Sequence, residues 1–296
     1  MRIIRHPKRK NLKGSVVALG TFDGVHRGHR KVVKNAVKYA DKLGVASLAI
    51  TFDPHPQQLI IPKRGLKLLT TLREREELFA DLGVDGVVVV KFQKRTQQLS
   101  TEAFVKEYLV DKLGVRRVFV GFDYAFGKGR KGNTALLKEY GKKYGFKVSV
   151  VSPVSSGKHI IKSRIIRELV VSGKFAKAVT LLGHGYQLSG KVVKGYGRGE
   201  SLGFQTANLQ LDPHKLIPFP GVYAGYALGK KCAIHIGSRP TFGEGNLAVE
   251  VHILNFRKNI RGKHLNVLLT KRLRDELQFS DVEKLKRQIS RDIKRT

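Results

Sequence analysis

The sequence is nearly free of sulfur and has no tryptophan: its 296 residues include one cysteine and one methionine. A single cysteine excludes a disulfide within the chain and is typical of a reducing compartment. We interpret it, Cys232, as a small buried apolar side chain. No run approaches the roughly 18 apolar residues of a membrane-spanning helix. The basic start, MRIIRHPKRK, lacks the apolar segment of a signal peptide. We therefore expect a soluble, cytoplasmic protein that does not cross a membrane.

Acidic residues are also scarce. The chain has 57 Lys and Arg against 23 Asp and Glu, a formal net charge of +34. A field of this size attracts polyanions of any kind, nucleotides and nucleic acids included. Because the charges are spread along the chain, the sequence favours non-specific polyanion binding over a dedicated nucleic-acid site. The surplus exceeds what small anionic substrates require, and no sequence feature explains it.

The first half of the chain alternates strand-like and helical runs. With 41% apolar residues and 296 positions, the chain is long enough for two domains with separate cores. Strand–helix alternation with apolar strands predicts an α/β fold, a doubly wound parallel sheet covered on both faces. We expect its strands at 15–22, 45–52, 85–92, 116–123 and 147–154. We expect its helices at 29–44, 72–83, 100–114, 134–145, 163–173 and 175–183.

From Tyr186 the hydrophobic period changes. Short strands separated by glycine and polar turns predict an all-β module, an antiparallel β-barrel or a sandwich, and we favour a small barrel. We expect its strands at 186–195, 221–229, 230–238, 247–256 and 264–273. A C-terminal helix follows, with Ser280 as its expected N-cap. The change of period predicts domains at 1–184 and 185–296.

Two histidines three residues apart mark the junction of the first strand and helix. In GTFDGVHRGH (20–29), His26 and His29 fall in the loop and first helical turn, where backbone N–H groups and the helix dipole favour an anion. One reaction that suits such a site is adenylyl transfer to a phosphate, which needs no base because the nucleophile is already an anion. It needs alignment and positive charge around the triphosphate. The alternatives are structural histidines or a zinc site, and zinc would require further Cys or His ligands at suitable spacing.

This stretch resembles the signature of a nucleotidyltransferase superfamily. Together with FDPHP (52–56), TTLREREELF (70–79) and GFDYAFGKGRKGN (121–133), it is similar to the N-terminal module of the bacterial bifunctional riboflavin kinase/FAD synthetase family. The resemblance extends over nearly the whole chain. It implies that His26 and His29 hold the ATP phosphates, that Asp123 lies near the adenosine and that His55 lies near the flavin. The other residues that it places at the nucleotide or its phosphates are Gly20, Phe22, Asp23, Gly28, Ser163 and Arg167.

One motif of the first half departs from the superfamily pattern. The second phosphate motif, ISSTxIR, reads IKSRIIR at 161–167. Lys162 and Arg164 therefore stand where the pattern has a serine and a threonine. Long cations in place of hydroxyls can still meet a triphosphate, or they can crowd it. This departure makes adenylylation the less secure of the two activities.

The second half contains a glycine-rich run followed by kinase-like motifs. In GYGRGESLGF (195–204), Gly195, Gly197 and Gly203 would let backbone N–H groups approach phosphates, although barrel turns also use glycine. LGFQTANL (202–209) resembles the riboflavin-kinase motif GFPTAN. The resemblance implies that Thr206 and Asn208 place Mg²⁺ on the nucleotide.

The strand AVEVHILNF (248–256) matches a further motif of the kinase family. Strand alternation puts Glu250 and His252 on one face, and the resemblance makes Glu250 the base for the ribityl 5′-hydroxyl. LRDELQF (273–279) also matches the family, and the resemblance implies that Arg274 lies near the flavin or the nucleotide. The family's DFxGDLYGK becomes NFRKNIRGK, so Asn255 and Arg261 depart from it.

We therefore expect a bifunctional enzyme that phosphorylates riboflavin to FMN and adenylylates FMN to FAD. Its implied partners are small molecules (riboflavin, FMN and ATP with Mg²⁺), with no obligate protein partner. The alternatives are a riboflavin kinase with a decayed adenylyltransferase site and a non-catalytic flavin- or nucleic-acid-binding protein. A cytidylyl or pantetheine-phosphate adenylyl transferase is disfavoured by the barrel motifs.

Overall fold

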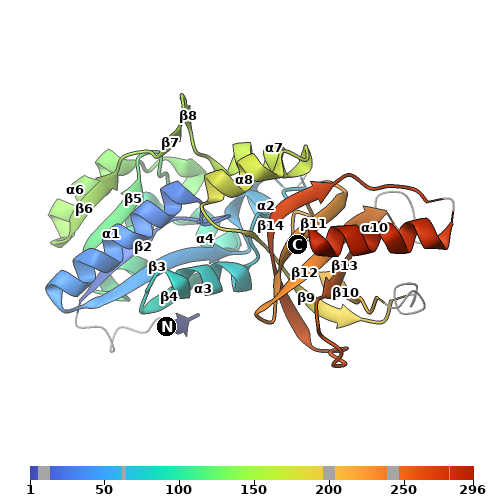
Figure 1. Cartoon of the computed structure of the whole chain (residues 1–296). Helices are drawn as coiled ribbons and strands as arrows, with labels where there is room; N and C mark the ends of the chain where they lie inside the picture. The colour runs from blue at the N-terminus through green and yellow to red at the C-terminus, as the bar shows by residue number, and fades with distance from the viewer. Residues whose placement is uncertain (6–13, 62–64, 196–203, 239–246, 280) are drawn as a thin grey trace. The chain divides into compact units, whose positions relative to one another are not determined.

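The computed structural model describes residues 1–5, 14–61, 65–195, 204–238, 247–279 and 281–296 (Figure 1). Contacts divide the chain into two compact units. The first comprises Met1–Lys67 and Arg75–Lys162, and the second comprises Leu68–Glu74 and Ser163–Thr296.

The first unit is built on a six-stranded sheet in the order β1-β4-β3-β2-β5-β6. All five neighbouring pairs are parallel, which confirms the predicted α/β sheet. The first strand, only three residues long, is too short for its pattern to be read from the sequence. The strands are β1 (Arg2–Ile4), β2 (Ser15–Leu19), β3 (Ala46–Asp53), β4 (Gly86–Lys91), β5 (Val115–Gly121) and β6 (Lys147–Val151).

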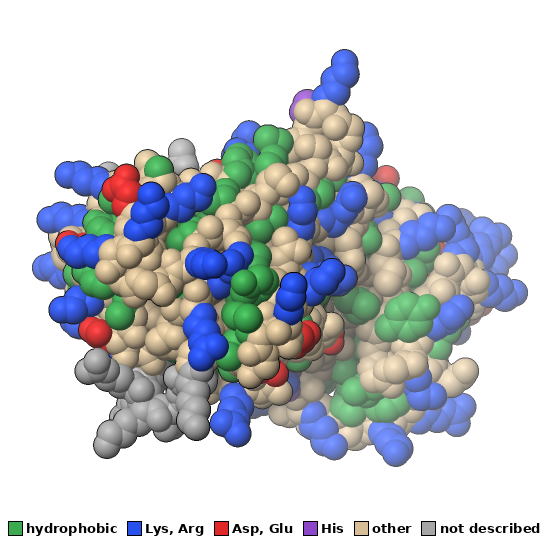
Figure 2. All heavy atoms as spheres, turned by 90° about the vertical axis from the view of Figure 1, so that its left-hand side faces the viewer, with side chains coloured by type: hydrophobic (Ala, Val, Ile, Leu, Met, Phe, Trp, Pro, Cys, Tyr) green, Lys and Arg blue, Asp and Glu red, His purple; other side chains and the backbone are tan. Residues whose placement is uncertain are grey.

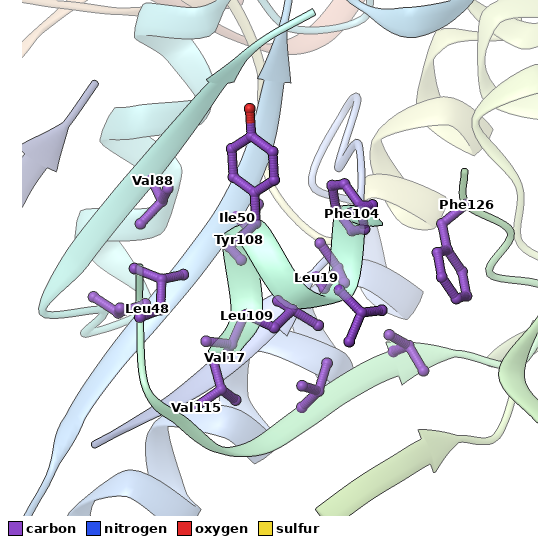
Figure 3. Packing of buried hydrophobic residues seen from close by; sticks show 14 of the residues in the cluster. Val17, Leu19, Leu48, Ile50, Val88, Phe104, Tyr108, Leu109, Val115 and Phe126 are labelled. Carbon is purple, nitrogen blue, oxygen red and sulfur yellow. The ribbon is translucent and has the colours of Figure 1, made fainter. Parts of the chain in front are cut away.

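Helices cover both faces of this sheet because the central strands are apolar on both sides. Val17 and Leu19 of β2 belong to the core cluster of Figure 3, which also contains Phe104 and Leu109. The alternate residues of β2 are also buried and point to the opposite face, and α1 packs against β2, β3 and β5. The helical segments are α1 (Arg27–Leu43), α2 (Pro56–Ile60), α3 (Leu72–Asp81), α4 (Lys94–Gln98), α5 (Thr101–Phe104) with a π-helical continuation (Val105–Asp111), a 3₁₀ turn (Lys128–Arg130) and α6 (Thr134–Tyr144). A short hairpin, β7 (Ser155–Ser156) and β8 (His159–Ile160), follows β6.

The second unit contains a closed antiparallel barrel in the order β10-β13-β12-β11-β14-β9, as predicted. Its strands are β9 (Tyr186–Val193), β10 (Ala207–Leu211), β11 (Gly221–Ala227), β12 (Lys230–Ser238), β13 (Leu247–Ile253) and β14 (His264–Arg274). The sequence analysis missed β10, whose five residues carry the kinase-like motif. Its helices are α7 (Ser163–Val171), α8 (Phe175–Leu182) and α10 (Val282–Lys294).

The start of α10 corrects one prediction. Its N-cap is Asp281, whose side chain accepts from the backbone N–H of Lys284 at 2.7 Å. The expected N-cap, Ser280, lies outside the described residues. Both residue types are good N-caps, so the pattern did not separate two adjacent candidates.

The contacts also group α7 and α8 with the barrel, so the second unit begins before the predicted domain boundary at 184/185. Spatial contacts show which segments pack together, whereas the hydrophobic period shows where the type of secondary structure changes. The division of the two activities at 184/185 therefore stays a prediction.

A buried ion pair fixes the segment Leu68–Glu74 in the second unit. Lys215 Nζ lies 2.7 Å from Glu74 Oε2, and both side chains are fully buried. Lys215 also donates to the carbonyl of Leu69 at 2.5 Å and lies over the ring of Tyr186. The other carboxylate oxygen of Glu74 accepts from the backbone of Ser189 at 3.0 Å. Such a pair is tolerated in the interior because hydrogen bonds compensate both charges.

The net charge is distributed over the surface. Figure 2 shows Lys and Arg side chains scattered across the face in view, with few carboxylates between them. No helix in the described ranges is long and apolar enough to cross a membrane.

Breaking the Glu74–Lys215 pair should destabilise the protein strongly. Lys215→Met leaves a buried carboxylate without its cation, so we expect the free energy of unfolding to fall by about 3–5 kcal/mol. Urea unfolding followed by circular dichroism measures this. The double variant Glu74→Gln/Lys215→Met should lose less than the two single losses combined. As the matched control, Lys286→Met breaks an exposed pair with Glu283 and should change stability by less than about 1 kcal/mol. A loss below about 1 kcal/mol in Lys215→Met would contradict the compensating role of the pair.

Candidate functional sites

Three of the predicted site segments start at one edge of the parallel sheet. β3 and β5 flank β2 on its two sides. The loop with His26 and His29 follows β2, the loop with His55 follows β3, and Asp123 follows β5. Parallel strands end at the same edge, where open α/β sheets bind their ligands. The structure therefore brings these segments together at the expected edge.

The two motif histidines stack on each other at the start of α1. Their ring centroids are 3.6 Å apart and the ring planes differ by 19°. His26 is the N-cap of α1, and its Nδ1 accepts from the backbone N–H of His29 at 3.4 Å. Because Nδ1 accepts, the proton of a neutral His26 sits on Nε2. A Cβ atom at Gly28 would lie 3.2 Å from the His26 ring, so the glycine leaves room for this stack.

The loop before the histidines is buried and strained. Phe22 and Val25 adopt positive φ angles of 55° and 37°, a conformation that costs non-glycine residues about 1–3 kcal/mol each and clusters at functional sites. Phe22 packs edge-on against His29 with ring centroids 5.3 Å apart. A Cβ atom at Gly20 would lie 3.0 Å from the Phe22 ring. Asp23 is buried in the same loop, at 1% exposure.

His55 caps the short helix α2 in the same way that His26 caps α1. Its Nδ1 accepts from the backbone N–H of Gln57 at 3.2 Å, and its own backbone N–H donates to Gln58 Oε1 at 3.1 Å. The buried imidazole is thereby fixed in orientation, and in the neutral form its proton sits on Nε2.

The environment of His29 disfavours its charged form. Burial of the ring lowers its pKa well below the ordinary value of 6.5, and the positive charges available at His26, His55 and Arg75 lower it further. Within the described part of the chain, His29 Nδ1 is buried and makes no hydrogen bond. The site therefore offers a neutral imidazole with a polar atom that a ligand could satisfy.

Asp123 is exposed and lies beside one of the cations that departs from the superfamily pattern. Lys162 Nζ is 3.9 Å from Asp123 Oδ2 and 5.9 Å from the centroid of the Phe122 ring. This substituted lysine therefore has an acidic neighbour on the same unit.

The second substituted cation is also paired. Arg164 Nη1 donates to Glu168 Oε1 at 2.7 Å, one helical turn along α7. Ser163 is the first residue of α7, and Arg167 lies on the same helix, both half-buried. These two residues belong to the second unit.

The barrel contains a pocket of about 460 Å³ at the end of β9 and the start of β10. Three predicted site residues line it: Gly195, Thr206 and Asn208. The described lining has no Asp or Glu, and its cations are Lys194, Arg257, Lys258 and Arg261. A pocket of this charge suits an anionic ligand.

Asn208 connects this pocket to Glu250. The two residues are directly opposite in the antiparallel β10–β13 ladder, so their side chains share one face of the barrel. A side chain at Gly195 would collide with the amide of Asn208. Along β13, Glu250 and His252 are half-buried while the residues between them are buried, as the alternation predicts.

His252 holds the segment in front of Thr206. Its Nδ1 lies 2.9 Å from the carbonyl oxygen of Gln205, which can only accept, so the imidazole donates. Its ring also packs edge-on against Phe204, with centroids 5.7 Å apart. Gln205 stands where the family motif has proline. A hydrogen bond to its backbone carbonyl restrains the segment without the proline ring.

Arg274 makes structural contacts. Its Nε and Nη2 donate to Asp292 Oδ2 at 3.0 and 2.7 Å, which ties β14 to α10. Its Nη1 donates to the carbonyl of Asp275 at 2.8 Å. The predicted contact of Arg274 with flavin stays a prediction.

Two predicted site residues, Gly197 and Gly203, lie outside the described residues. Within the described ranges no group of three or more His, Cys, Asp or Glu side chains could hold a metal ion.

Sequence reasoning missed two features of these sites. Arg75 is buried near His29, but in LREREELF it reads as one charge among several on a helix. Of the four cationic residues that line the barrel pocket, only Arg261 was singled out from the sequence. Its neighbours Arg257 and Lys258 became visible as lining residues once the barrel closed.

Comparison with known proteins covers the chain from end to end. A family model for FAD synthetase matches residues 8–165, and one for riboflavin kinase matches residues 182–296. Bifunctional riboflavin kinase/FMN adenylyltransferases from Escherichia coli (strain K12) and Listeria monocytogenes are 36% and 38% identical to it. The alignments cover 95% and 94% of this chain and 91% and 90% of those proteins.

Structural comparison agrees over the same length. The crystal structure of a Streptococcus pneumoniae chain described as a macrolide-efflux protein superposes with a TM-score of 0.85 at 28% identity. The superposition covers 99% of this chain and 98% of that one. The two matched domains and the full-length relatives establish that this chain belongs to the bifunctional riboflavin kinase/FMN adenylyltransferase family.

Proposed function

We propose that residues 1–184 transfer AMP from ATP to FMN and that residues 185–296 phosphorylate riboflavin with a separate ATP. The chain is an enzyme with both activities, as its two domain matches and its relatives establish. The observation that carries the division is that the candidate residues of the two reactions fall in different matches, with Arg167 just beyond the end of the first. His26, His29 and His55 fall in the first, and Thr206, Asn208 and Glu250 fall in the second.

In the first reaction the riboflavin 5′-hydroxyl attacks the γ-phosphorus of ATP. The new O–P bond gives FMN, ADP leaves, and the hydroxyl proton is released. Glu250 is the candidate acceptor of that proton, because it carries a carboxylate on the barrel face of Asn208. The cationic pocket wall supports binding of the ATP phosphates next to Gly195 and Thr206.

Mg²⁺ fits the donor set of the kinase site. Thr206 and Asn208 supply a hydroxyl and an amide oxygen at one pocket, and oxygen donors are those that Mg²⁺ prefers. Bound there, Mg²⁺ would neutralise charge on the phosphates and would complete its coordination with phosphate oxygens and water. Asn208 is held in place by its buried strand position and by the close approach of Gly195.

In the second reaction a phosphate oxygen of FMN attacks the α-phosphorus of ATP. FAD forms and pyrophosphate leaves. No base is needed, so the protein must align the two anions and stabilise the charge that develops on the phosphate oxygens. Histidines fixed by N-cap hydrogen bonds suit this task, because neutral imidazole N–H groups donate without moving a proton.

The two substituted cations are compatible with adenylylation. Lys162 and Arg164 each have a carboxylate neighbour on their own unit, Asp123 and Glu168. Both pairs are exposed and therefore weak. They reduce the charge that these cations would otherwise present to a triphosphate. Beyond its small-molecule substrates, the scattered charge supports only non-specific, salt-sensitive association with polyanions.

The first test separates the two activities in one chain. His29→Asn should lower FAD formation from FMN and ATP at least about 100-fold and leave FMN formation from riboflavin within about twofold. Glu250→Gln should show the reverse pattern, because it removes the proposed proton acceptor. Chromatography of flavins and release of ADP and pyrophosphate measure both reactions. Parallel losses of both activities in either variant would contradict the division.

The second test concerns the metal. Chelation of Mg²⁺ should abolish FMN formation, and Asn208→Leu should raise the Mg²⁺ concentration needed for half-maximal kinase activity by about tenfold or more. Gln210→Leu is the matched control, because this exposed residue lies two positions further along β10 and does not line the pocket. An unchanged Mg²⁺ requirement in Asn208→Leu would exclude Asn208 as a ligand.

The third test concerns the charge of His29. Because the folded state lowers the pKa of His29 below its ordinary value of 6.5, the unfolded chain binds this proton more readily. The resulting contribution to stability is complete above about pH 6.5 and is lost as the pH falls toward the lowered pKa. His29→Asn should therefore flatten the decline of the thermal midpoint between about pH 7 and 5.

His159→Asn, in the exposed β7–β8 hairpin, serves as the control for this pH dependence and should leave the decline unchanged. Imidazole NMR titration reads the His29 pKa directly. A His29 resonance that titrates at or above pH 6.5 would contradict the buried, neutral state.

A further inference from the structure

One fully buried charged side chain lies behind the adenylyltransferase loops. Arg75, on α3, is 1% exposed. Its Nη1 donates to the carbonyl of Thr21 at 3.0 Å, to Thr51 Oγ1 at 2.6 Å and to the carbonyl of Phe52 at 3.2 Å. Burial of a guanidinium is unfavourable without such partners. Arg75 is therefore retained in the interior by contacts with these loops.

Its three acceptors come from the ends of two adjacent strands. Thr21 follows β2 and begins the loop that leads to His26, while Phe52 is near the end of β3, just before the loop with His55. The hydroxyl of Thr51 also donates to the carbonyl of Thr21 at 2.9 Å. A single guanidinium thus connects the backbones of both histidine-bearing segments.

The parallel ladder alone does not reach these positions. Regular β2–β3 pairing ends at Leu19 and Ile50, and one further backbone bond joins Gly20 to Ile50 at 3.2 Å. Beyond that point β3 continues its pairing with β4 to Asp53, while β2 has ended at Leu19. Arg75 bridges them there, where the loop is strained at Phe22.

Arg75 is also close enough to act on His29 through its charge. It contributes, after burial of the ring and the neighbouring histidines, to the lowered pKa of His29. A guanidinium at this position stays protonated at any working pH, so its influence is constant.

We propose that Arg75 is a positioning residue for adenylyl transfer, which fixes the loops after β2 and β3 so that His26, His29 and His55 converge on the reacting phosphates. The proposal deepens the function proposed above and rests on it. Arg75 itself does not contact substrate. It acts by holding the segments that do.

The test compares Arg75→Met, Arg75→Gln and Arg75→Lys with Arg73→Met, an exposed arginine on the same helix. Misplacement of catalytic groups by about 1 Å can cost about 100-fold in rate. We expect Arg75→Met to lower kcat for FAD formation by about that factor, with a much smaller change in the KM for ATP. Arg75→Lys, which retains the charge and one donor nitrogen, should recover part of the loss, and Arg73→Met should behave as wild type.

Riboflavin phosphorylation in the same chain is the internal control. It should stay within about twofold of wild type in every variant, because the kinase residues belong to the other unit. Arg75→Gln keeps a hydrogen-bond donor and serves if Arg75→Met does not fold. A folded Arg75→Met or Arg75→Gln variant with FAD formation within about twofold of wild type would overturn the proposal. A parallel loss of both activities that follows a lowered thermal midpoint would overturn it as well.

A measurement that does not depend on catalysis distinguishes a failure of the Arg75 proposal from a failure of the proposed function. In imidazole NMR spectra of the free protein, Arg75→Met should shift the resonances of His29 and His55, assigned through His→Asn variants. Unchanged resonances would refute the positioning role even if FAD forms normally. A wild-type protein that makes no FAD from FMN would refute the proposed function, while the histidine shifts would still test the role of Arg75.

Discussion

Parallel pairing of β2 with β3 on one side and β5 on the other is the constraint on which the proposed adenylyltransferase site depends. In a parallel sheet every strand ends at the same edge, so three segments far apart in sequence begin side by side. Their apolar residues point alternately to the two covered faces, which fixes the register. A slip of one residue would exchange the side chains that β2 presents to its two helical layers and would shift the histidine loop relative to its neighbours.

In the barrel unit, antiparallel pairing brings residues from distant motifs together. Closure of the six strands puts β10 beside β13, so Asn208 and Glu250 become direct neighbours although they lie in different motifs. Specific partners offset the unfavourable free energy of burying charged groups. Glu74 and Lys215 compensate each other inside this unit, and Asp292 holds Arg274 at the C-terminal helix. These pairs fix segments that hydrophobic contacts alone would leave free to slide.

Charge has two distinct roles in this protein. Buried cations such as Arg75 and Lys215 make several hydrogen bonds each, and they determine local geometry. Surface cations are spread over the visible face in Figure 2, and the pocket wall concentrates four of them around Gly195 and Asn208. The pocket cations match anionic substrates. The surface excess remains larger than any site in the described residues requires.

The two modules, the strand–helix order and the motif residues could be predicted from the sequence, because hydrophobic period, helix caps and motif spacing are local properties. Sequence reasoning missed β1, whose three residues are too few to show a period, and β10, whose residues were interpreted only as part of a motif, and it placed the N-cap of α10 one residue before Asp281. The stacking of His26 on His29, the pairing of Asn208 with Glu250 and the position of Arg75 behind the histidine loops depend on contacts between distant segments, which no local pattern shows. An arginine in a charged helix looks the same in sequence whether it is solvated or buried. Its role depends on which distant backbone carbonyls the fold brings within hydrogen-bonding distance.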